Sequence, residues 1–493
     1  MTVLSTASNT PPGTERGSGP LLAVLVGAYL MVAVDATVVN VALPSLQRRL
    51  HLSPTGLSWV PNAYSLAFGG LLLLGSRIGD RLGRRRTFGT GVLLFTLASL
   101  LGGLAPTSGC LLAARALQGV GAALSTPNVL ALIATNFPEG RARNRAIGLY
   151  SAAASAGASI GLVLGGLLTS WLSWRWSLLI NVPIGFAVAA AAPRLLTEPP
   201  RHQGSFDVPG AVTGTLGSTA LVYGFVQAAQ QGFGDRWALA AFAAAAALLA
   251  AFVLVELRAA DPLLPIELLR DRGRVGAYLN LLLMPAGMFP AFFFLTLVFQ
   301  QVLHYSALRT GVAFLPMTLA MFATVRLLPG RLGRTGTRPP LIAGALLLLL
   351  GGVWLGVLPE HGGYLGTLLG PLLLLGFGAG LSFLPLSVQV LSGVSPARSG
   401  AAAGLLQTLQ WTGGTVGNAV LVALYGSGLR HGGGSPTHRQ VHGLDLAFSG
   451  GAAITGLGLL VAVLLIRERG AAAPTDQAAA RPADQKVRPS VAR

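Results

Sequence analysis

The sequence predicts an all-α polytopic membrane protein, and three observations support that fold class. Charged residues make up 10% of the 493 residues, whereas a soluble domain carries about 25%. Hydrophobic residues contribute 52%, and the mean hydropathy is +0.65. Charge-free apolar segments recur along the chain, many of them longer than the roughly 20 residues that cross a bilayer. The composition excludes a soluble enzyme, a disordered chain and, with Cys110 as the only cysteine, a disulfide scaffold.

Fourteen apolar segments are predicted to form transmembrane helices, each bounded by Gly, Pro, Arg or polar residues. Residues 1–19 form a polar tail without the pattern of a cleavable signal peptide, so the first apolar segment should be retained. Residues 468–493 are rich in Ala, Pro, Gln and Arg and should form a disordered tail. The expected helices cover residues 20–43, 57–77, 87–105, 109–133, 146–169, 176–196, 207–230, 236–257, 274–302, 309–330, 338–358, 364–391, 399–426 and 444–466.

The distribution of basic residues predicts the orientation in the membrane. An even number of spans places both termini on one side, and Lys and Arg concentrate in the cytoplasmic segments of membrane proteins. We therefore expect a multi-pass protein of the cell (inner or plasma) membrane with cytoplasmic N- and C-termini. With that orientation Arg115 lies inside a helix, and the basic residues left in external loops are Arg48, Arg49, Arg175, Arg236, Arg309, Arg430 and Arg439.

The net charge of +18 would suggest nucleic acid as the partner of a soluble protein. Here the arginines stand in short runs between long apolar segments, so the expected partner is the lipid bilayer and no nucleic acid is expected. Nothing in the pattern calls for self-association, and we expect a monomer.

An internal repeat predicts two similar halves. The sequence GSRIGDRLGRRRT (75–87) follows the second expected helix, and a degenerate copy, PGRLGRTGTRP (329–339), follows the tenth. The copies are eight helices apart instead of six, which predicts two six-helix bundles with two helices inserted between them. The expected organisation is a tail (1–19), a six-helix bundle (20–196), two inserted helices with linkers (197–270), a second six-helix bundle (271–467) and a tail (468–493).

Several motifs occur in the order of a known family: DATVVNVALP (35–44), GDRLGRRR (79–86), RALQGVGAA (115–123), WRWSLLINVPIG (174–185), DPLLPIELL (261–269) and LVFQQVLHYSALRTGVAFLP (297–316). Over residues 20–467 the chain resembles the fourteen-helix drug:proton antiporters of the major facilitator superfamily. The resemblance implies the major facilitator fold and multidrug or antibiotic efflux driven by the proton gradient through alternating access. It implies no other cofactor, with protons and a small amphipathic substrate as partners.

Asp35 lies about fifteen residues into the first apolar helix. An ionised carboxylate at that depth costs on the order of 2.5–3.5 kcal/mol, so it needs a partner or a proton. A carboxyl group poised between those two states is a proton carrier. The alternative is a structural hydrogen bond to a neighbouring helix. The resemblance favours proton exchange, because Asp35 occupies the acidic position of the family's first-helix motif.

Arg115 is the only basic residue expected deep in a helix, the fourth, and Gln118 follows on the same face. A buried guanidinium with five donors needs acceptors or a counter-charge. It could act as a structural clamp on backbone carbonyls. The resemblance assigns it to proton coupling, because Arg115 and Gln118 match the family's RxxQG motif.

Asp80, Arg81, Gly83 and Arg84 form the expected cytoplasmic turn after the second helix. Anchoring by positive charge explains part of this arginine run. Asp80 is the informative residue, because an acid among arginines should form an ion pair and could cap a neighbouring helix N-terminus. The resemblance implies a conformational latch between the two bundles, although Ser76 stands where the motif begins with Gly.

Small residues recur every fourth position in the fifth expected helix, which predicts close packing against another helix. The ridge also resembles the antiporter motif GxxxGPxxGG, as GASIGLVLGG (157–166). Leu162 replaces the usual Pro, so a kink expected from that Pro is lost. The ridge consists of Ala153, Gly157, Gly161 and Gly165, and the motif adds Gly166.

Polar and aromatic residues in or near the spans are candidates for a substrate cavity, although aromatic residues at span ends are also common interface anchors. With a single deep carboxylate, neutral or monocationic substrates are expected over dicationic ones. The candidates are Asn62, Tyr64, Gln118, Gln300, Gln301, Gln389, Gln407 and Trp411.

No other chemistry is predicted. The segment HGGGSPTHRQVH (431–442) contains histidines, but its composition predicts a flexible external loop and no metal site. The chain lacks GxxxxGK[ST] and any nucleophile–base arrangement, so no ATPase and no enzyme is expected. Two alternatives to export remain open from the sequence. They are a proton-coupled importer or facilitator of a metabolite, which Leu162 keeps open, and a non-transporting membrane sensor or scaffold.

Overall fold

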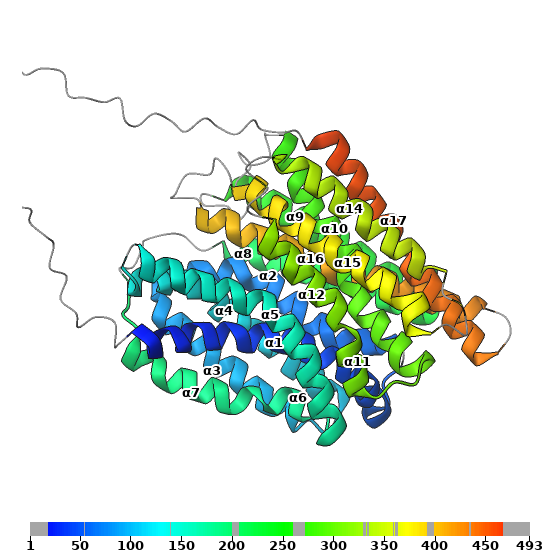
Figure 1. Ribbon diagram of the computed structural model, residues 1–493, viewed down its shortest axis with the longest axis horizontal. Helices are drawn as coiled ribbons and strands as arrows, with labels where there is room; N and C mark the ends of the chain where they lie inside the picture. The colour runs from blue at the N-terminus through cyan, green and yellow to red at the C-terminus, as the bar shows by residue number, and fades with distance from the viewer. Residues whose placement is uncertain are drawn as a thin grey trace, which may run out of the picture.

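The computed structural model is built from helices, and the part of the chain that it describes contains no strand (Figure 1). Helices occupy each of the fourteen expected segments, because runs of apolar residues satisfy their backbone groups internally only as helices when lipid is the solvent. The described residues are 18–466, apart from 54, 139, 200–206, 260–271, 329–331, 333–334, 358, 360–362, 392–398 and 433–434.

The N-terminal half holds the first six expected spans. Helix α1 extends seven residues beyond the expected end at 43, and the sixth span is interrupted, with a short α6 before α7. The half comprises α1 (Ser18–Leu50), α2 (Trp59–Leu82), α3 (Arg84–Gly103), α4 (Ser108–Asn136), α5 (Arg141–Trp171), α6 (Trp176–Leu179) and α7 (Asn181–Leu195).

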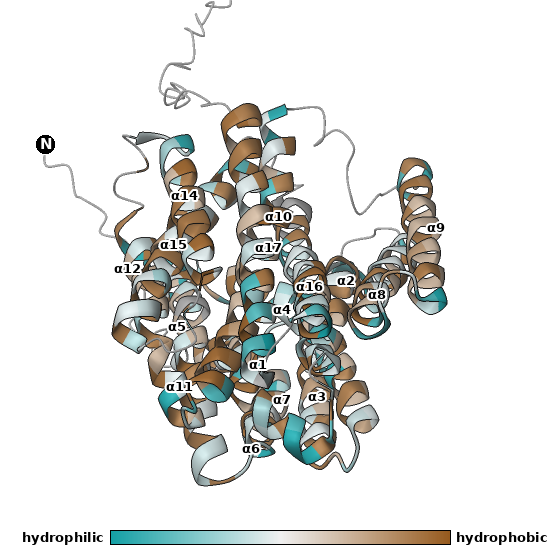
Figure 2. Cartoon of the chain, turned by 90° about the vertical axis from the view of Figure 1, so that its right-hand side faces the viewer, coloured by the Kyte–Doolittle hydropathy of each residue, from teal (hydrophilic) through white to brown (hydrophobic). Residues whose placement is uncertain are grey.

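Helices α8 (Val208–Gln231) and α9 (Arg236–Arg258) form a hairpin between the two halves of the chain. Each helix has an aspartate as its N-cap: the Asp207 and Asp235 carboxylates accept backbone N–H groups of the first turn. Helix α8 packs against α2 and α16, whereas α9 packs mainly against α8 and stands apart at one side of the molecule (Figure 2). Many side chains of α9 are therefore left for lipid.

The C-terminal half holds the last six expected spans, three of them modified. The span expected at 309–330 is divided by a break near Phe314, the span at 274–302 ends in a π-helix, and the span at 364–391 begins with one. The half comprises α10 (Arg272–Leu297), η3 (Val298–Val302), α11 (Ala307–Ala313), α12 (Leu315–Leu327), α14 (Arg338–Leu355), η4 (Tyr364–Leu368), α15 (Leu369–Leu391), α16 (Ser399–His431) and α17 (Pro436–Leu465).

One expectation about a loop is wrong. The segment 431–442 is expected to be a flexible loop, but most of it belongs to α17. This helix begins at Pro436 because the Ser435 hydroxyl accepts the His438 N–H at 3.1 Å and a proline suits the first helical position. Of the expected tail at 1–19, Ser18 and Gly19 instead begin α1, and residues 1–17 lie outside the described residues. The expected tail at 468–493 and five residues of the second motif copy, 329–331, 333 and 334, also lie outside them.

Among the described residues, 11 helices are long and apolar enough to cross a membrane. Helix α5 is a twelfth if its two parts, Arg141–Ala153 and Ala156–Trp171, form one span bent by 41°. Helices α8 and α16 occupy the other two expected spans, but Gln, Thr and Gly residues lower their hydropathy. The helical architecture and its apolar outer surface are those of an integral membrane protein.

Helix α1 begins and α17 ends on the same side of the molecule (Figure 1). We call this the terminal side, and the side where α1 ends and α17 begins the far side. In the N-terminal half, α1 packs on α5 and α2 packs on α4; in the C-terminal half, α10 packs on α16 and α17. The halves meet where α2 contacts α16 and where α5 contacts α11. These contacts enclose the polar groups described next.

Candidate functional site

Asp35 is fully buried in the middle of α1 and accepts three hydrogen bonds. Its Oδ2 accepts a hydrogen bond from Arg115 Nη1 at 2.6 Å. Its Oδ1 accepts hydrogen bonds from Gln118 Nε2 at 3.0 Å and from Asn181 Nδ2 at 2.7 Å. Every one of these partners is a donor, which is the environment that an ionised carboxylate requires.

Arg115 is 1% exposed and is held from several directions. Besides Asp35, its Nη1 contacts Gln118 Oε1 at 3.0 Å, and its Nε donates to the Val60 carbonyl at 3.2 Å. The guanidinium carbon lies 4.5 Å from the centre of the Tyr64 ring, within the range of a cation–π contact. Arg115 thus has both kinds of partner that a buried guanidinium needs, a counter-charge in Asp35 and a backbone carbonyl at Val60.

The buried cluster around Asp35 draws on five helices of the N-terminal half. Asp35 comes from α1, Tyr64 from α2, Arg115 and Gln118 from α4, and the remaining residues are Ser99 of α3 and Asn181 of α7. Ser99 Oγ accepts Gln118 Nε2 at 2.7 Å. Neither Ser99 nor Asn181 was predicted from the sequence. Asn181 carried a signal, because it is a polar residue within the motif WRWSLLINVPIG (174–185).

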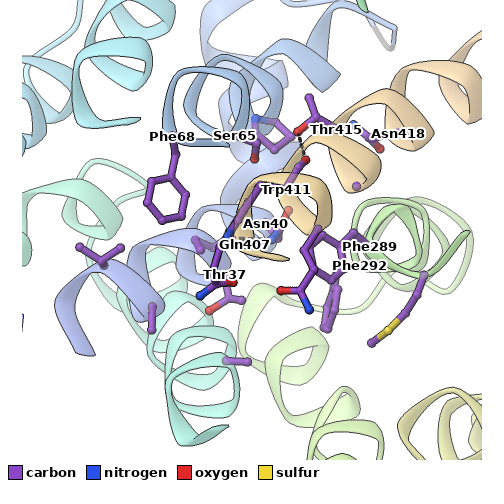
Figure 3. Close-up of a pocket in the computed structure, with 18 of the residues that line it drawn as sticks. Thr37, Asn40, Ser65, Phe68, Phe289, Phe292, Gln407, Trp411, Thr415 and Asn418 are labelled. Carbon is purple, nitrogen blue, oxygen red and sulfur yellow. Dashed lines mark hydrogen bonds between the residues drawn. The ribbon is translucent and has the colours of Figure 1, made fainter. Parts of the chain in front are cut away.

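A cavity of about 290 Å³ lies between the two halves and is shown in Figure 3. Its walls are mostly aromatic and aliphatic, with amide and hydroxyl groups set among them. Helices α1, α2, α4 and α5 contribute from one half and α10, α12, α15 and α16 from the other. The lining includes Tyr29, Thr37, Asn40, Asn62, Ser65, Phe68, Met288, Phe289, Phe292, Phe293, Met321, Phe383, Gln407, Gln410, Trp411, Thr415 and Asn418.

The described residues of the cavity wall include no acidic or basic side chain. Asp35 and Arg115 are not among the lining residues, but Tyr64 contacts both Arg115 and the wall residue Trp411. The Tyr64 ring lies 6.1 Å from the ring of Trp411, which lines the cavity. Trp411 also contacts Phe68 of α2 at 5.0 Å and Phe289 of α10 at 5.9 Å between ring centres. One aromatic cluster thus joins the charged pair, the cavity and both halves.

Of the eight residues expected in the cavity, Asn62, Gln407 and Trp411 line it. The other five lie elsewhere. Two of them, Gln118 and Tyr64, belong to the buried cluster around Asp35. Gln389 accepts a hydrogen bond from the Thr337 hydroxyl at 3.0 Å, where α14 begins. Gln300 and Gln301 lie in η3, on the far side.

The far side is closed by hydrogen bonds between the halves. Gln300 Nε2 donates to the Val41 carbonyl at 2.8 Å, and Gln301 Nε2 donates to Gln47 Oε1 at 3.1 Å. Further along, the Leu308 N–H donates to the Ser170 hydroxyl at 3.0 Å. We call this set the far-side closure. It joins the far-side ends of α1 and α5 to η3 and α11 of the C-terminal half.

The glycine ridge of α5 packs against α1, the helix that carries Asp35. A Cβ added at Gly157 would lie 2.6 Å from Cβ of Ala33, and at Gly161 and Gly165 it would meet backbone atoms of α1. Gly166 instead approaches Ala307 and Leu308 of the other half. The ridge lets α5 lie close to both α1 and the far-side closure, as the expected small-residue packing requires.

Asp80 forms an ion pair with Arg84 at the terminal-side turn between α2 and α3. Gly83 has φ of +110°, a conformation that favours glycine, and it lies against the Glu198 carboxylate. Glu198, which sequence reasoning missed, accepts the Arg85 N–H at 3.0 Å. Asp80, Gly83, Arg84 and Arg85 lie in the N-terminal half, and Glu198 follows α7 by three residues. Arg81 also lies in this turn, at the end of α2.

No group of three or more His, Cys, Asp or Glu side chains among the described residues could hold a metal ion. His431 instead contacts Ser427 of its own helix.

The chain matches the model of the Major Facilitator Superfamily over residues 25–418. It is 41% identical to the cephamycin export protein CmcT of Amycolatopsis lactamdurans over 470 residues, covering 94% of this chain and 95% of that protein. It is 42% identical to the puromycin resistance protein pur8 of Streptomyces alboniger over 465 residues, covering 92% of each. The solved structure of the POT family transporter PepTSo has the same fold, with a TM-score of 0.64 at 15% identity over 90% of this chain and 98% of that one.

Proposed function

Since this chain belongs to the Major Facilitator Superfamily, a family of transporters and not of enzymes, we propose that it exports small amphipathic compounds in exchange for protons. Relatives named for cephamycin export and puromycin resistance support export over import or a sensory role. The proton gradient supplies the energy, and no cofactor takes part. The protein works as a monomer in the cell membrane, with its termini in the cytoplasm and fourteen transmembrane helices.

The observation that carries the proposal is the buried Asp35–Arg115 pair, which Tyr64 links to an uncharged cavity. A proton on Asp35 removes the negative charge that balances Arg115. Breaking such a buried pair costs about 3–5 kcal/mol, because the remaining charge has no counter-charge. That penalty is relieved if α1 and α4 move relative to each other. Protonation of Asp35 thus favours a different arrangement of α1 and α4 in the N-terminal bundle.

Tyr64 connects the movement of Arg115 with the cavity where the substrate would bind. It stacks over the Arg115 guanidinium on one side and contacts Trp411 of α16 on the other. A shift of Arg115 therefore changes the packing of a cavity wall that both halves share. Substrate and proton compete through this contact, which is the coupling that exchange requires.

The halves then move as two bundles, 20–196 and 271–467, with the inserted helices at 197–270 at the side. In the proposed orientation the far side faces the outside, so the far-side closure must open for the substrate to leave the protein. Gly166 at the end of the α5 ridge packs against Ala307 and Leu308 at this closure. The turn with Asp80, Arg81, Gly83 and Arg84 acts as the conformational latch when the terminal side closes.

The proposal is tested in inside-out vesicles with a respiration-generated pH gradient. Puromycin and a panel of neutral amphipathic compounds are added, and proton release is followed for the native protein and Asp35→Asn. Asp235→Asn is the matched control, because Asp235 caps α9 far from the cluster and Asn caps helices equally well.

Proton release that depends on both compound and Asp35, and that persists in Asp235→Asn, is the expected result. Movement of compounds without proton release would identify a facilitator. No movement of any compound would favour a sensor.

A further inference from the structure

Two asparagines from opposite halves meet at the cavity. Asn418 Nδ2 of α16 donates to Asn62 Oδ1 of α2 at 3.0 Å, and both residues line the cavity. They are 6% and 1% exposed. Asn62 lies one turn into α2, which starts on the far side, so the pair sits at the end of the cavity nearest the far-side closure.

The hydrogen bond satisfies only half of the two amides. Asn62 Nδ2 and Asn418 Oδ1 are buried and have no hydrogen-bond partner among the described residues. Exchanging oxygen and nitrogen on both amides leaves the same outcome, one free N–H donor and one free carbonyl acceptor. Buried polar groups in native proteins nearly always have partners, and an unpaired one marks a position where a partner is to be found. The pair therefore offers one free donor and one free acceptor, one on α2 and one on α16.

We infer that the Asn62–Asn418 pair recognises a neutral lactam or primary carboxamide edge of the substrate, a group that presents one carbonyl and one N–H side by side. The substrate carbonyl accepts from Asn62, and its N–H donates to Asn418. The aromatic wall formed by Phe289, Phe292 and Trp411 takes the planar apolar part of the molecule. Charged groups are disfavoured, since the described wall offers them no counter-charge.

The Asn62–Asn418 hydrogen bond also links substrate binding to the arrangement of the two halves, because it is a direct contact between them. A bound lactam inserts into or beside this bond and so changes a contact that holds α2 and α16 together. The inference rests on the proposed export function for its biological meaning, but it concerns equilibrium binding and is measured without a gradient.

The probes are 4-phenyl-2-quinolinone and 4-phenylcoumarin, which have the same shape and differ by a lactam N–H in place of a lactone oxygen. Dissociation constants are measured by tryptophan fluorescence with the full-length protein in nanodiscs, and empty nanodiscs correct for partitioning. The variants are Asn62→Leu and Asn418→Leu. Thr415→Val is the matched control: it lines the cavity one turn away, but its hydroxyl already donates to the Trp411 carbonyl at 2.7 Å.

The native protein and Thr415→Val are expected to prefer the lactam on the order of tenfold, the effect of one well-placed hydrogen bond. Both Asn variants should bind the two compounds equally, and their retained lactone binding shows that they are folded. Equal binding by the native protein, no binding of the lactam, or an unchanged preference in the Asn variants would overturn the inference. If lactam preference holds while proton release fails, the export proposal fails alone; if export succeeds without the preference, the inference fails alone.

Discussion

Asp35 and Arg115 lie 80 positions apart in the chain and meet at 2.6 Å in a region where neither side chain is more than 1% exposed. Such a pair is stable only as a pair, because either charge alone would be buried without compensation. In the proposed mechanism this pair is the proton site and the cavity is the substrate site, and Tyr64 contacts both Arg115 and Trp411 of the cavity wall. The two proposed sites would then communicate through packing and not by sharing one carboxylate.

A double-substitution cycle tests this dependence. Arg115→Ala should lower the stability by about 3–5 kcal/mol, because it leaves the Asp35 carboxylate unpaired. Adding Asp35→Asn should restore part of that loss, since a neutral amide tolerates the site better. Melting temperatures of the single and double variants in detergent measure the effect. Additive losses would mean that the two groups do not interact.

Tyr64 should couple proton to substrate through its ring. Tyr64→Phe keeps the ring over Arg115 and against Trp411 and should retain compound-driven proton release. Tyr64→Leu removes both contacts and should bind substrate while releasing few or no protons. Parallel binding and vesicle measurements compare the two variants. Normal proton release by Tyr64→Leu would remove this residue from the coupling path.

The glycine ridge should tolerate no larger residue where α5 meets α1. Gly161→Ala places a Cβ against Thr37 and 2.7 Å from the Val34 carbonyl, and overpacking of this kind costs about 1–3 kcal/mol. Gly148→Ala in the same helix meets nothing within 4 Å and serves as the control. The melting temperature should fall for Gly161→Ala and stay level or rise for Gly148→Ala. Equal behaviour would show that the close approach is unimportant.

The far-side closure should set the balance between conformations. Replacing both Gln300 and Gln301 by Leu removes two hydrogen bonds between the halves, each worth about 0.5–1.5 kcal/mol. Spin labels at Arg49→Cys and Arg309→Cys, in a Cys110→Ser background, report the separation of the two halves. The distance distribution should shift toward longer values. Gln389→Leu, on the opposite side, should leave it unchanged.

The class of protein and the candidates for its charged pair follow from the sequence alone. Hydropathy acts locally, so apolar runs predict spans without any tertiary information. A charge inside such a run is costly wherever the helix packs, which is why Asp35 and Arg115 stand out. The same reasoning predicted the glycine ridge, because a spacing of four places Gly157, Gly161 and Gly165 on one helix face.

Only the tertiary structure decided which side chains meet. In lipid every face of a helix is apolar, so periodicity does not show which face a neighbour covers, and association depends on detailed packing. The partners Ser99 and Asn181, the contact of Trp411 with α2 and the Asn62–Asn418 pair all depend on that packing. Gln300 and Gln301 look like cavity residues in the sequence, yet the approach of η3 to the end of α1 places them in the far-side closure. Local chemistry determined which groups need partners, and helix packing determined which partners they have.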